Sequence, residues 1–436
     1  MLSDDPQVVR AAGDIGVDLT VVCGAGQRDF GMVAIPDGTR QVFVQDSVGL
    51  ESVLFGLYRA GVDPAGFDAI YSTDEGGVVT AAALGHSFGV RAIEPRVAAL
   101  FRDKSLAKAA LRAAGIEAAD FRVIEDIVEF PDDYALPFRP AVLKPVAGGA
   151  TYRTYVVHTE AELRAVVARE RDDKRHRAYI LEEFMPGDEW HVDGVMFGGE
   201  LRFVSVGSYQ KTCLTTLAEN DWLRTFSFDP VHDADVYERV TPLAERVLRT
   251  LGLDSGVFHM ELFHDRESGR LAFGECAARR GGGLIEEQVF RKFGVSLAEA
   301  ALRCALGVAP VIEPVRRPEA VGSVYLPYTS GVLLATPSAE DLIALPNVEY
   351  ALVEWPIGFT TPMMKSTINK VGQVLLTAGS RAELLRRATE IVGWFAERTI
   401  IVPPKATARQ LREWYARVAP DGGRAAAAWK NGSRVG

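Results

Sequence analysis

Two glutamates in a predicted β-hairpin could together hold a divalent cation. The hairpin is "FHMELFHDRESGRLAFGEC" (258–276), in which "ESG" has the composition of a turn. With that turn, Glu261 pairs with Glu275. Phe263 then pairs with Phe273, and all four side chains share one face because side chains alternate along a strand. Opposed carboxylates repel, and Mg²⁺ commonly binds one or two carboxylates with water and phosphate oxygens. The alternatives are solvated acids, pairing with an arginine, or a one-residue register shift that puts the acids on opposite faces.

Two arginines and three glycines follow the second glutamate, in "GECAARRGGG". The planar donor fork of Arg279 suits a phosphate or carboxylate better than a lysine would. Arg280 could hold a substrate carboxylate or point to solvent. Gly281–Gly283 would let the backbone approach a reacting group and donate N–H groups to it.

Two upstream lysines could contact phosphate groups. Lys144 ends the strand-like run "AVLKP" and precedes the glycine loop "GGATYRTY" (148–155). Backbone N–H groups of such a loop can surround phosphate oxygens, although the Walker A pattern is absent. Lys104 lies in a predicted helix. The alternatives are a strand-edge lysine beside a hairpin turn for Lys144, and a solvated helix lysine for Lys104.

An acidic linker, "LEEFMPGDE" (181–189), could contact a nucleoside. Glu182 and Glu189 flank Pro186-Gly187, so they could hold an adenine amino group and ribose hydroxyls. The alternative is that both are ordinary surface acids. His191 shares a face with Glu189, so a ribose or substrate contact is one interpretation.

Three other polar residues lie near the predicted site in sequence. His259 is expected on the opposite face from Glu261, as a packed or surface histidine. Cys276 is expected in the core. Lys211 lies in a Thr-rich segment (207–226) expected to be a mobile loop, so it either reaches substrate on loop closure or is solvated.

The elements that must position these residues follow an α/β pattern. Strands are predicted at 17–23, 40–46 and 67–73, with helices between them, which indicates a small parallel sheet. Helices are also predicted within 95–116, from Thr159 and over 235–252. The "CGAGQRD" turn at 23–29 lacks the third glycine of a dinucleotide fingerprint, so a tight turn is the preferred interpretation.

The composition limits the class of protein. The chain has 436 residues, 48% hydrophobic and 24% charged, with a net charge of −10. These values favour a globular enzyme and argue against a nucleic-acid or anionic membrane partner. Four scattered cysteines, no membrane-length apolar run and no signal-peptide core favour the cytoplasm.

Taken in order, the lysines, the glycine loop, the acidic linker and the two acids with an arginine resemble the ATP-grasp superfamily. The closest subgroup is similar to the carboxylate–amine ligases related to bacterial L-amino acid ligases. The resemblance implies an α/β fold with a small parallel-sheet N-terminal domain (1–95), a two-lobed ATP-grasp domain (96–310, with lobes at about 96–185 and 186–310), a C-terminal α+β module (311–405), and a C-terminal helix with a disordered tail (406–436). A homodimer is also expected at the family level.

The resemblance also assigns the nucleotide and metal contacts. It implies that Lys104 and Lys144 contact the ATP phosphates, that Gly148, Gly149 and Thr151 cover them, that Glu182 and the backbone of Met185 contact adenine, that Glu189 contacts ribose, and that Glu261 and Glu275 bind two Mg²⁺ ions. Arg279 would contact the transferring phosphate or the substrate carboxylate. Many members carry Asn where this chain has Ala277, so the second metal site is expected to be weaker or completed by water or another group.

The implied reaction joins a small-molecule carboxylate, expected to be an amino acid, to an amine, and yields ADP and phosphate. Phosphoryl transfer depends mainly on positioning and charge neutralisation, which the two lysines, Arg279 and Mg²⁺ would provide. The alternatives are a carboxyphosphate-forming enzyme similar to biotin carboxylase, and a non-catalytic ATP-binding module.

Overall fold

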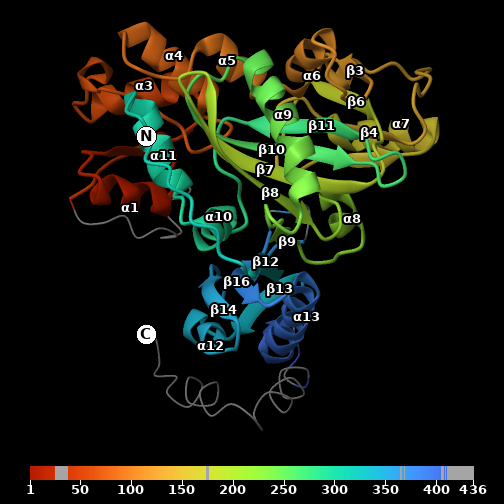
Figure 1. Cartoon of the computed structure of the whole chain (residues 1–436). Helices are drawn as coiled ribbons and strands as arrows, with labels where there is room; N and C mark the ends of the chain where they lie inside the picture. Colours follow the sequence, from red (N-terminus) through yellow and green to blue (C-terminus); the bar gives the residue numbers. More distant parts are fainter. Residues whose placement is uncertain are drawn as a thin grey trace.

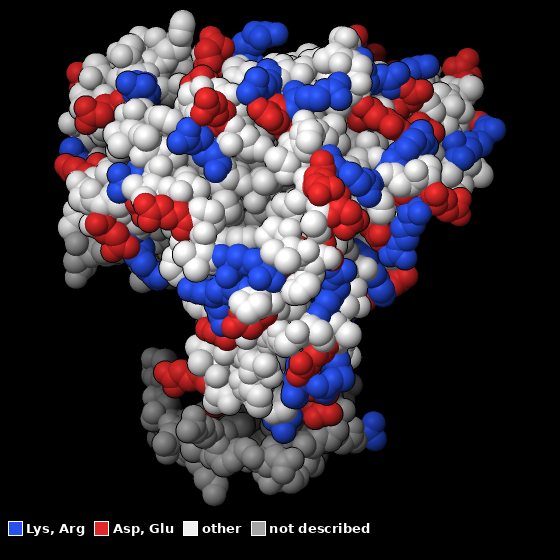
Figure 2. Space-filling model, in the orientation of Figure 1, with Lys and Arg blue, Asp and Glu red and all other residues white. Residues whose placement is uncertain are grey.

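The computed structural model describes residues 1–24, 38–172, 176–363, 366–367, 369–403, 407 and 409. In Figure 1 the N-terminal part, a large central sheet with a smaller sheet beside it, and a C-terminal module form three connected bodies. Among the described helices, none combines the length and the apolar character needed to cross a membrane. Figure 2 shows basic and acidic side chains interspersed over the visible face, with several basic groups just above the C-terminal module.

The N-terminal part holds a short parallel sheet. Its elements are α1 (Pro6–Asp14), β1 (Thr20–Gly24), β2 (Arg40–Val44), α3 (Leu50–Arg59), the 3₁₀ turn η1 (Pro64–Gly66) and α4 (Val78–Phe88). The parallel pairing of β1 with β2 confirms the predicted sheet type. The strand predicted at 67–73 is wrong, because Ile70 bonds to Arg91 and Tyr71 to Leu2, so the segment divides its bonds between two partners and forms no ladder. Most of the "CGAGQRD" turn lies outside the described residues.

The smaller sheet carries the first lysines of the site. Two helices lead into it, α5 (Pro95–Leu100) and α6 (Lys104–Ala113), as predicted. Its strands are antiparallel in the order β3-β6-β4-β5: β3 (Phe121–Ile124), β6 (Tyr179–Glu183), β4 (Ala141–Pro145) and β5 (Tyr155–Val157). The 3₁₀ turn η2 (Ile127–Glu129) and α7 (Glu160–Glu170) complete it, and the Thr159 side chain caps α7 as expected. Leu143, Leu163 and Leu181 belong to the buried core of this unit.

The central sheet has eight antiparallel strands, in the order β11-β10-β7-β8-β9-β12-β16-β14. Their bounds are β7 (Asp188–Phe197), β8 (Glu200–Tyr209), β9 (Arg224–Ser227), β10 (Gly256–His264), β11 (Leu271–Ala277), β12 (Ala320–Leu326), β14 (Val348–Val353) and β16 (Gly372–Ala378). The helices packed with it are α8 (Cys213–Ala218), α9 (Ala234–Leu251), α10 (Ile285–Phe293) and α11 (Leu297–Leu306). Helix α9 buries Val240, Ala244 and Val247 and contacts both β8 and α6, which fixes the lysine-bearing helix relative to the sheet.

The segment 207–226, predicted to be a mobile loop, is ordered secondary structure. Strand β8 runs to Tyr209, α8 follows from Cys213, and β9 begins at Arg224. The threonines that suggested a loop serve other purposes, because Thr212 caps α8 and Thr225 is buried in β9. Polar composition misled the prediction here, since these polar groups find partners inside the fold.

The C-terminal module adds three strands to the central sheet and a small sheet of its own. That small sheet has the order β15-β13-β17, with β13 (Gly331–Ala335), β15 (Thr360–Thr361) and β17 (Ile400–Val402). Helix α12 (Ala339–Ile343) contacts β14, and α13 (Arg381–Arg398) contacts β12 and β16 of the central sheet. The succession of β16 and α13 confirms the strand–helix pattern predicted near 365–379. Because β12 pairs with β9, the central sheet continues across the boundary expected at residue 310.

Candidate active site

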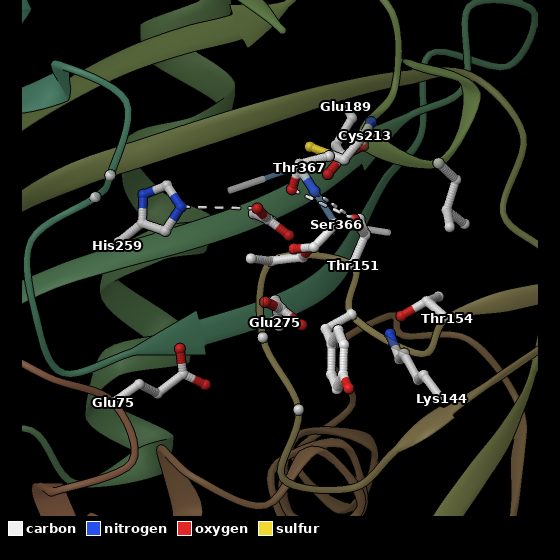
Figure 3. A pocket seen from close by; sticks show the side chains of 18 of the residues that line it. Glu75, Lys144, Thr151, Thr154, Glu189, Cys213, His259, Glu275, Ser366 and Thr367 are labelled. Carbon is white, nitrogen blue, oxygen red and sulfur yellow. Dashed lines mark hydrogen bonds and ion pairs between the residues drawn. The ribbon is translucent and has the colours of Figure 1, made fainter. Parts of the chain in front are cut away.

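A cavity of about 880 Å³ lies where the three bodies meet. This volume is in the range of sites for small molecules and cofactors. Its lining includes Glu75 from the N-terminal part, Lys104 and Lys144 from the smaller sheet, Glu261 and Glu275 from the central sheet, and Thr367 from the C-terminal module. Residues separated by almost 300 positions in the sequence therefore share one cavity (Figure 3).

The predicted pairing of the two hairpin glutamates is confirmed. Glu261 lies directly opposite Glu275 in the antiparallel β10–β11 pair. The pairing predicted for Phe263 with Phe273 is wrong, because a bulge between Glu261 and Leu262 shifts the register. Phe273 therefore pairs with Leu262 and is buried in the core, whereas Phe263 lines the cavity. The bulge leaves the two acids together and changes only the residues nearer the turn.

The two opposed acids have different partners. The Lys104 Nζ lies 3.1 Å from Glu275 Oε2. Burial would raise the pKa of Glu275, but Lys104 and Lys144 outweigh it and lower the pKa to about 2. Glu261 accepts a long hydrogen bond of 3.4 Å from the Tyr209 hydroxyl, and His259 Nε2 lies 3.7 Å from its Oε1. Among the described residues, no lysine or arginine is ion-paired with Glu261.

Lys104 is the first residue of α6, and it is buried rather than solvated. Asp103 caps the helix by accepting bonds from the backbone of Ser105 and Leu106, which directs Lys104 toward the cavity. Its Nζ also donates to the carbonyl oxygen of Gly148 at 2.7 Å. One ammonium group thus links the glycine loop of the smaller sheet to Glu275 of the central sheet.

Lys144 and Glu182 are neighbours on adjacent strands of the smaller sheet. The Lys144 Nζ lies 2.9 Å from Glu182 Oε2, and a second lysine, Lys108, lies 3.5 Å from Oε1. Burial would raise the pKa of Glu182, but Lys108 and Lys144 outweigh it and lower the pKa. Burial lowers the pKa of Lys108 to about 8, against the effect of Glu182. Sequence reasoning missed Lys108, although its spacing of four from Lys104 places both on one helix face.

The glycine loop contacts the C-terminal module. Gly148, Gly149 and Thr151 line the cavity as predicted for a phosphate-covering loop. The Ser366 hydroxyl donates to the carbonyl oxygen of Ala150 at 2.6 Å, and the Thr367 N–H donates to Thr151 Oγ1 at 3.2 Å. These contacts, visible in Figure 3, were not foreseen, because no local pattern links positions about 216 residues apart.

The linker acid Glu189 lies near the opposed acids Glu261 and Glu275. It lines the cavity with Met185 and accepts a hydrogen bond of 2.7 Å from the Cys213 N–H. Burial raises the pKa of Glu189 to about 8, and the nearby Glu261 adds to the effect. Ligand atoms of Glu189, Cys213 and Glu261 all lie within 4.8 Å of one another.

The two arginines are held by acids from other parts of the fold. Arg279 Nη2 lies 2.8 Å from Glu75 Oε2, and its Nη1 donates to the carbonyl oxygen of Arg280. Arg280 is buried and paired with Asp5 and Glu286, so it does not point to solvent. Both arginines line the cavity. Sequence reasoning missed Glu75, which precedes Gly76-Gly77 in a turn and gave no periodic signal.

Lys211 is not brought into the cavity. It precedes α8 and its Nζ is bonded to Glu219 at 2.6 Å and to Asp221 at 2.7 Å, on a partly exposed surface. The neighbouring residues Thr212 and Cys213 do line the cavity. The side chain therefore points away from the site whose wall its own segment forms.

The prediction that His259 faces away from Glu261 is wrong. Residues two apart in a strand lie on the same face, and His259 lines the cavity beside Glu261. Its Nδ1 lies 2.8 Å from Asp193 Oδ1, while His191 Nδ1 lies 2.7 Å from Oδ2. Burial would lower the pKa of His259, but Asp193 and Glu261 raise it to about 10. Cys276 is buried, as predicted.

Comparison with known proteins identifies a domain type in a part of the chain that carries many of the cavity residues. Residues 138–288 match the model of the ATP-grasp domain. The chain therefore contains a region that matches the ATP-grasp domain. That match spans the glycine loop, the linker, the opposed acids and both arginines.

Relatives place it among the carboxylate–amine ligases, as the sequence predicted. It is 26% identical over 296 residues to an L-arginine-specific L-amino acid ligase of Bacillus subtilis, covering 66% of this chain and 69% of the relative. It is 30% identical over 168 residues to carnosine synthase 1 of Mus musculus, covering 38% of this chain and 20% of that protein. The crystal structure of an L-amino acid ligase from Bacillus licheniformis has a TM-score of 0.72 and 17% identity, covering 92% of this chain and 96% of the other, which supports the fold.

Proposed function

We propose that this ATP-grasp ligase joins an amino acid, through its carboxylate, to an amine. A carboxylate oxygen attacks the γ-phosphorus of ATP, and the bond from that phosphorus to the bridging oxygen breaks, which gives an acyl-phosphate and ADP. The amine nitrogen then attacks the acyl carbon, the carbon–oxygen bond to phosphate breaks, and the nitrogen loses a proton. The products are an amide, ADP and phosphate.

One observation carries the proposal. The opposed carboxylates of Glu261 and Glu275 line the same cavity as the lysines Lys104 and Lys144. Phosphoryl transfer needs cations around the transferring group, held in position before the reaction. A cavity with lysines on one wall and acids suited to a divalent ion on the other meets that need.

The donor atoms support binding of Mg²⁺. Carboxylate oxygens are hard ligands, and Glu261 has no lysine or arginine ion pair within the described part of the chain. When bound, Mg²⁺ would neutralise phosphate charge and orient the γ-phosphoryl group. Ala277 offers no side-chain oxygen beside these acids, so any second ion would rely on water or on another protein group.

The remaining residues are proposed to bind nucleotide and substrate. Lys104, Lys144 and the loop residues Gly148, Gly149 and Thr151 would hold the phosphates; Glu182 and the Met185 backbone would contact adenine, and Glu189 the ribose. Arg279 would stabilise charge on the transferring phosphoryl group. Arg280, whose guanidinium is already paired with two acids, would support the adjoining glycines.

The choice of an amino acid as substrate rests on the relatives, which are named as an L-amino acid ligase and carnosine synthase 1. We further propose that segments 1–95, 96–310 and 311–405 each contribute one wall of the cavity, since residues of all three line it. The proposal also places the enzyme in the cytoplasm as a homodimer acting on small molecules.

The test is a screen of amino acid pairs for Mg²⁺-dependent ADP release, with product masses measured in the same reactions. We expect an amide whose mass equals the two substrates less one water. Glu275→Ala should reduce turnover at least about 10²-fold, whereas the matched variant Glu267→Ala, exposed in the turn of the same hairpin, should keep wild-type turnover. ADP release with bicarbonate alone would instead favour a carboxyphosphate-forming enzyme, and ATP binding without ADP release from any pair would favour a binding module.

A further inference from the structure

A buried carboxylate holds an imidazole, that of His259, which faces the cavity beside Glu261 and Glu275. Asp193 is 1% exposed, and its two oxygens accept from His259 Nδ1 and His191 Nδ1. His259 Nε2 is left pointing toward Glu261 at 3.7 Å. Both ring nitrogens of His259 therefore face carboxylates, and a doubly protonated imidazole has a donor for each side. Asp193 holds the ring on one side. On the other side, Figure 3 shows a dashed line from a nitrogen of His259 to a neighbouring carboxylate.

The strand register places this imidazole in a group of four side chains. His259 pairs with Ala277 across the β10–β11 ladder, and Glu261 pairs with Glu275 in the next row on the same face. Ala277 carries no polar side-chain atom. His259 is therefore the polar member of the row that adjoins the two acids, and the methyl group opposite it leaves space for the ring.

The same imidazole packs against the glycine run that follows Arg279. A Cβ atom built on Gly281 would lie 2.8 Å from His259 Nδ1 and 2.8 Å from Asp193 Oδ1. A real Cβ does not approach that closely, so the Gly281 backbone can rest on the Asp193–His259 pair only because it has no side chain. The Asp193–His259 pair thus lies against the backbone of Gly281, and its imidazole also lies beside Glu261.

We propose that His259 donates a hydrogen bond from Nε2 to an oxygen of the transferring phosphoryl group, and that Asp193 is the positioning residue that holds it there. This inference rests on the proposed ligase function. The contact involves no proton transfer, since the imidazole acts as a fixed donor. Donors that are fixed before the reaction and aimed at developing charge commonly contribute a factor of about 10²–10³ to kcat.

A metal ion held by His191, Asp193 and His259 is the competing explanation, since their ligand atoms lie within 4.8 Å of one another. The hydrogen-bonded arrangement argues against it. Both Asp193 oxygens are already engaged, by Nδ1 of His191 at 2.7 Å and by Nδ1 of His259 at 2.8 Å. An ion bound to Asp193 would have to compete with these two hydrogen bonds. Elemental analysis of the purified chain tests this directly, and a stoichiometric transition metal lost in His259→Gln would overturn the donor role.

The decisive experiment compares nucleotide affinities and rates in His259→Gln and His259→Asn. We expect kcat to fall about 10²-fold and the KM for ATP to rise about tenfold. Calorimetry with Mg²⁺ should show about tenfold weaker binding of the γ-imido analogue of ATP, while ADP, which lacks the γ-phosphoryl group, binds as in the wild type. Retained ADP affinity also establishes that each variant is folded.

The matched control is His264→Gln, in the same strand but stacked on Trp190 and outside the cavity lining. It should leave both affinities and kcat at wild-type values. If the His259 variants bind the ATP analogue as tightly as wild type and turn over within threefold of it, the inference is wrong. If wild type itself forms no ADP with any substrate pair, the proposed function fails instead. The affinity of each variant for the ATP analogue relative to ADP still tests the phosphate contact.

The role of Asp193 is tested by graded replacement. Asp193→Asn retains one acceptor oxygen and should lose less kcat than Asp193→Ala, with the same selective loss for the ATP analogue over ADP. Combining Asp193→Asn with His259→Gln should add no further loss, because both changes remove the same contact. Additive losses, or equal weakening of ADP, would show a general structural role for Asp193 and would contradict positioning.

Discussion

The two walls of the cavity carry opposite charges and balance them differently. On the wall formed by the smaller sheet and α6, Lys108 and Lys144 are both paired with Glu182. On the wall formed by the central sheet, Glu189 and Glu261 have no lysine or arginine ion pair within the described residues. The charge of the lysine wall is therefore partly offset by its own acid. On the acid wall Glu275 contacts Lys104, but Glu261 keeps a negative charge that a cation can neutralise.

Two buried glutamates of the linker, seven positions apart, also differ in the charge that surrounds them. Glu182 and Glu189 are both about 95% buried, yet the pKa of Glu182 is lowered, while burial raises the pKa of Glu189 to about 8. The difference lies in what each faces: two lysines for Glu182, and the carboxylate of Glu261 for Glu189. Burial alone does not fix the charge of an acid; the neighbouring charge decides it.

The largest expected effect comes from removing Lys144, one of the two lysines of the first wall that line the cavity. Lys144→Met should lower kcat/KM for ATP about 10²-fold, because it removes one phosphate cation and leaves Glu182 with Lys108 alone. Steady-state kinetics with ATP as the varied substrate measures this. A loss below threefold would mean that Lys144 serves only to neutralise Glu182.

Replacing Lys108 should affect stability rather than catalysis, because this lysine pairs with Glu182 but does not reach the cavity. It is 1% exposed and does not line the cavity. Lys108→Met should lower the free energy of unfolding by about 3 kcal/mol, because it removes one partner from a buried charge pair. Glu182→Gln should destabilise the Lys108→Met protein less than it destabilises the wild type, because the Lys108–Glu182 pair is already lost there. Urea unfolding of the wild type, both single variants and the double variant gives the coupling, and purely additive losses would contradict the pairing.

The sequence was sufficient where a signal is local. The hairpin turn and strand alternation predicted that Glu261 faces Glu275, and the capping residue Thr159 located the start of α7. The bulge after Glu261 could not be predicted, since nothing in the strand's alternation marks it. Glu75 and Ser366 were missed because they reach the cavity through tertiary packing, with partners more than 200 residues away. Lys108 could have been found, because it lies four residues after Lys104 on a helix.

The raised pKa of Glu189 should make the stability of the protein depend on pH. Between its ordinary pKa of 4.5 and the raised value of about 8, the folded state holds more protons than the unfolded state, so wild-type stability falls as pH rises. Glu189→Gln removes that dependence. The variant should therefore match the wild type near pH 4.5 and become the more stable protein as pH increases to 8, in urea titrations across that range. A stability difference independent of pH would show that Glu189 is ionised throughout.

The smallest expected effect comes from replacing Lys211, whose segment forms part of the cavity wall but whose side chain points away from the cavity. Its ammonium group is bonded to Glu219 and Asp221 on a partly exposed surface, and such pairs contribute at most about 1 kcal/mol. Lys211→Met should leave kcat and the KM for ATP within about twofold of wild type, which also makes it the matched lysine variant for Lys144→Met. A tenfold loss of kcat with normal stability would mean that the segment before α8 swings Lys211 into the cavity during turnover. The acid wall would then gain a protein cation in the reacting state, and the difference between the two walls would hold only for the free enzyme.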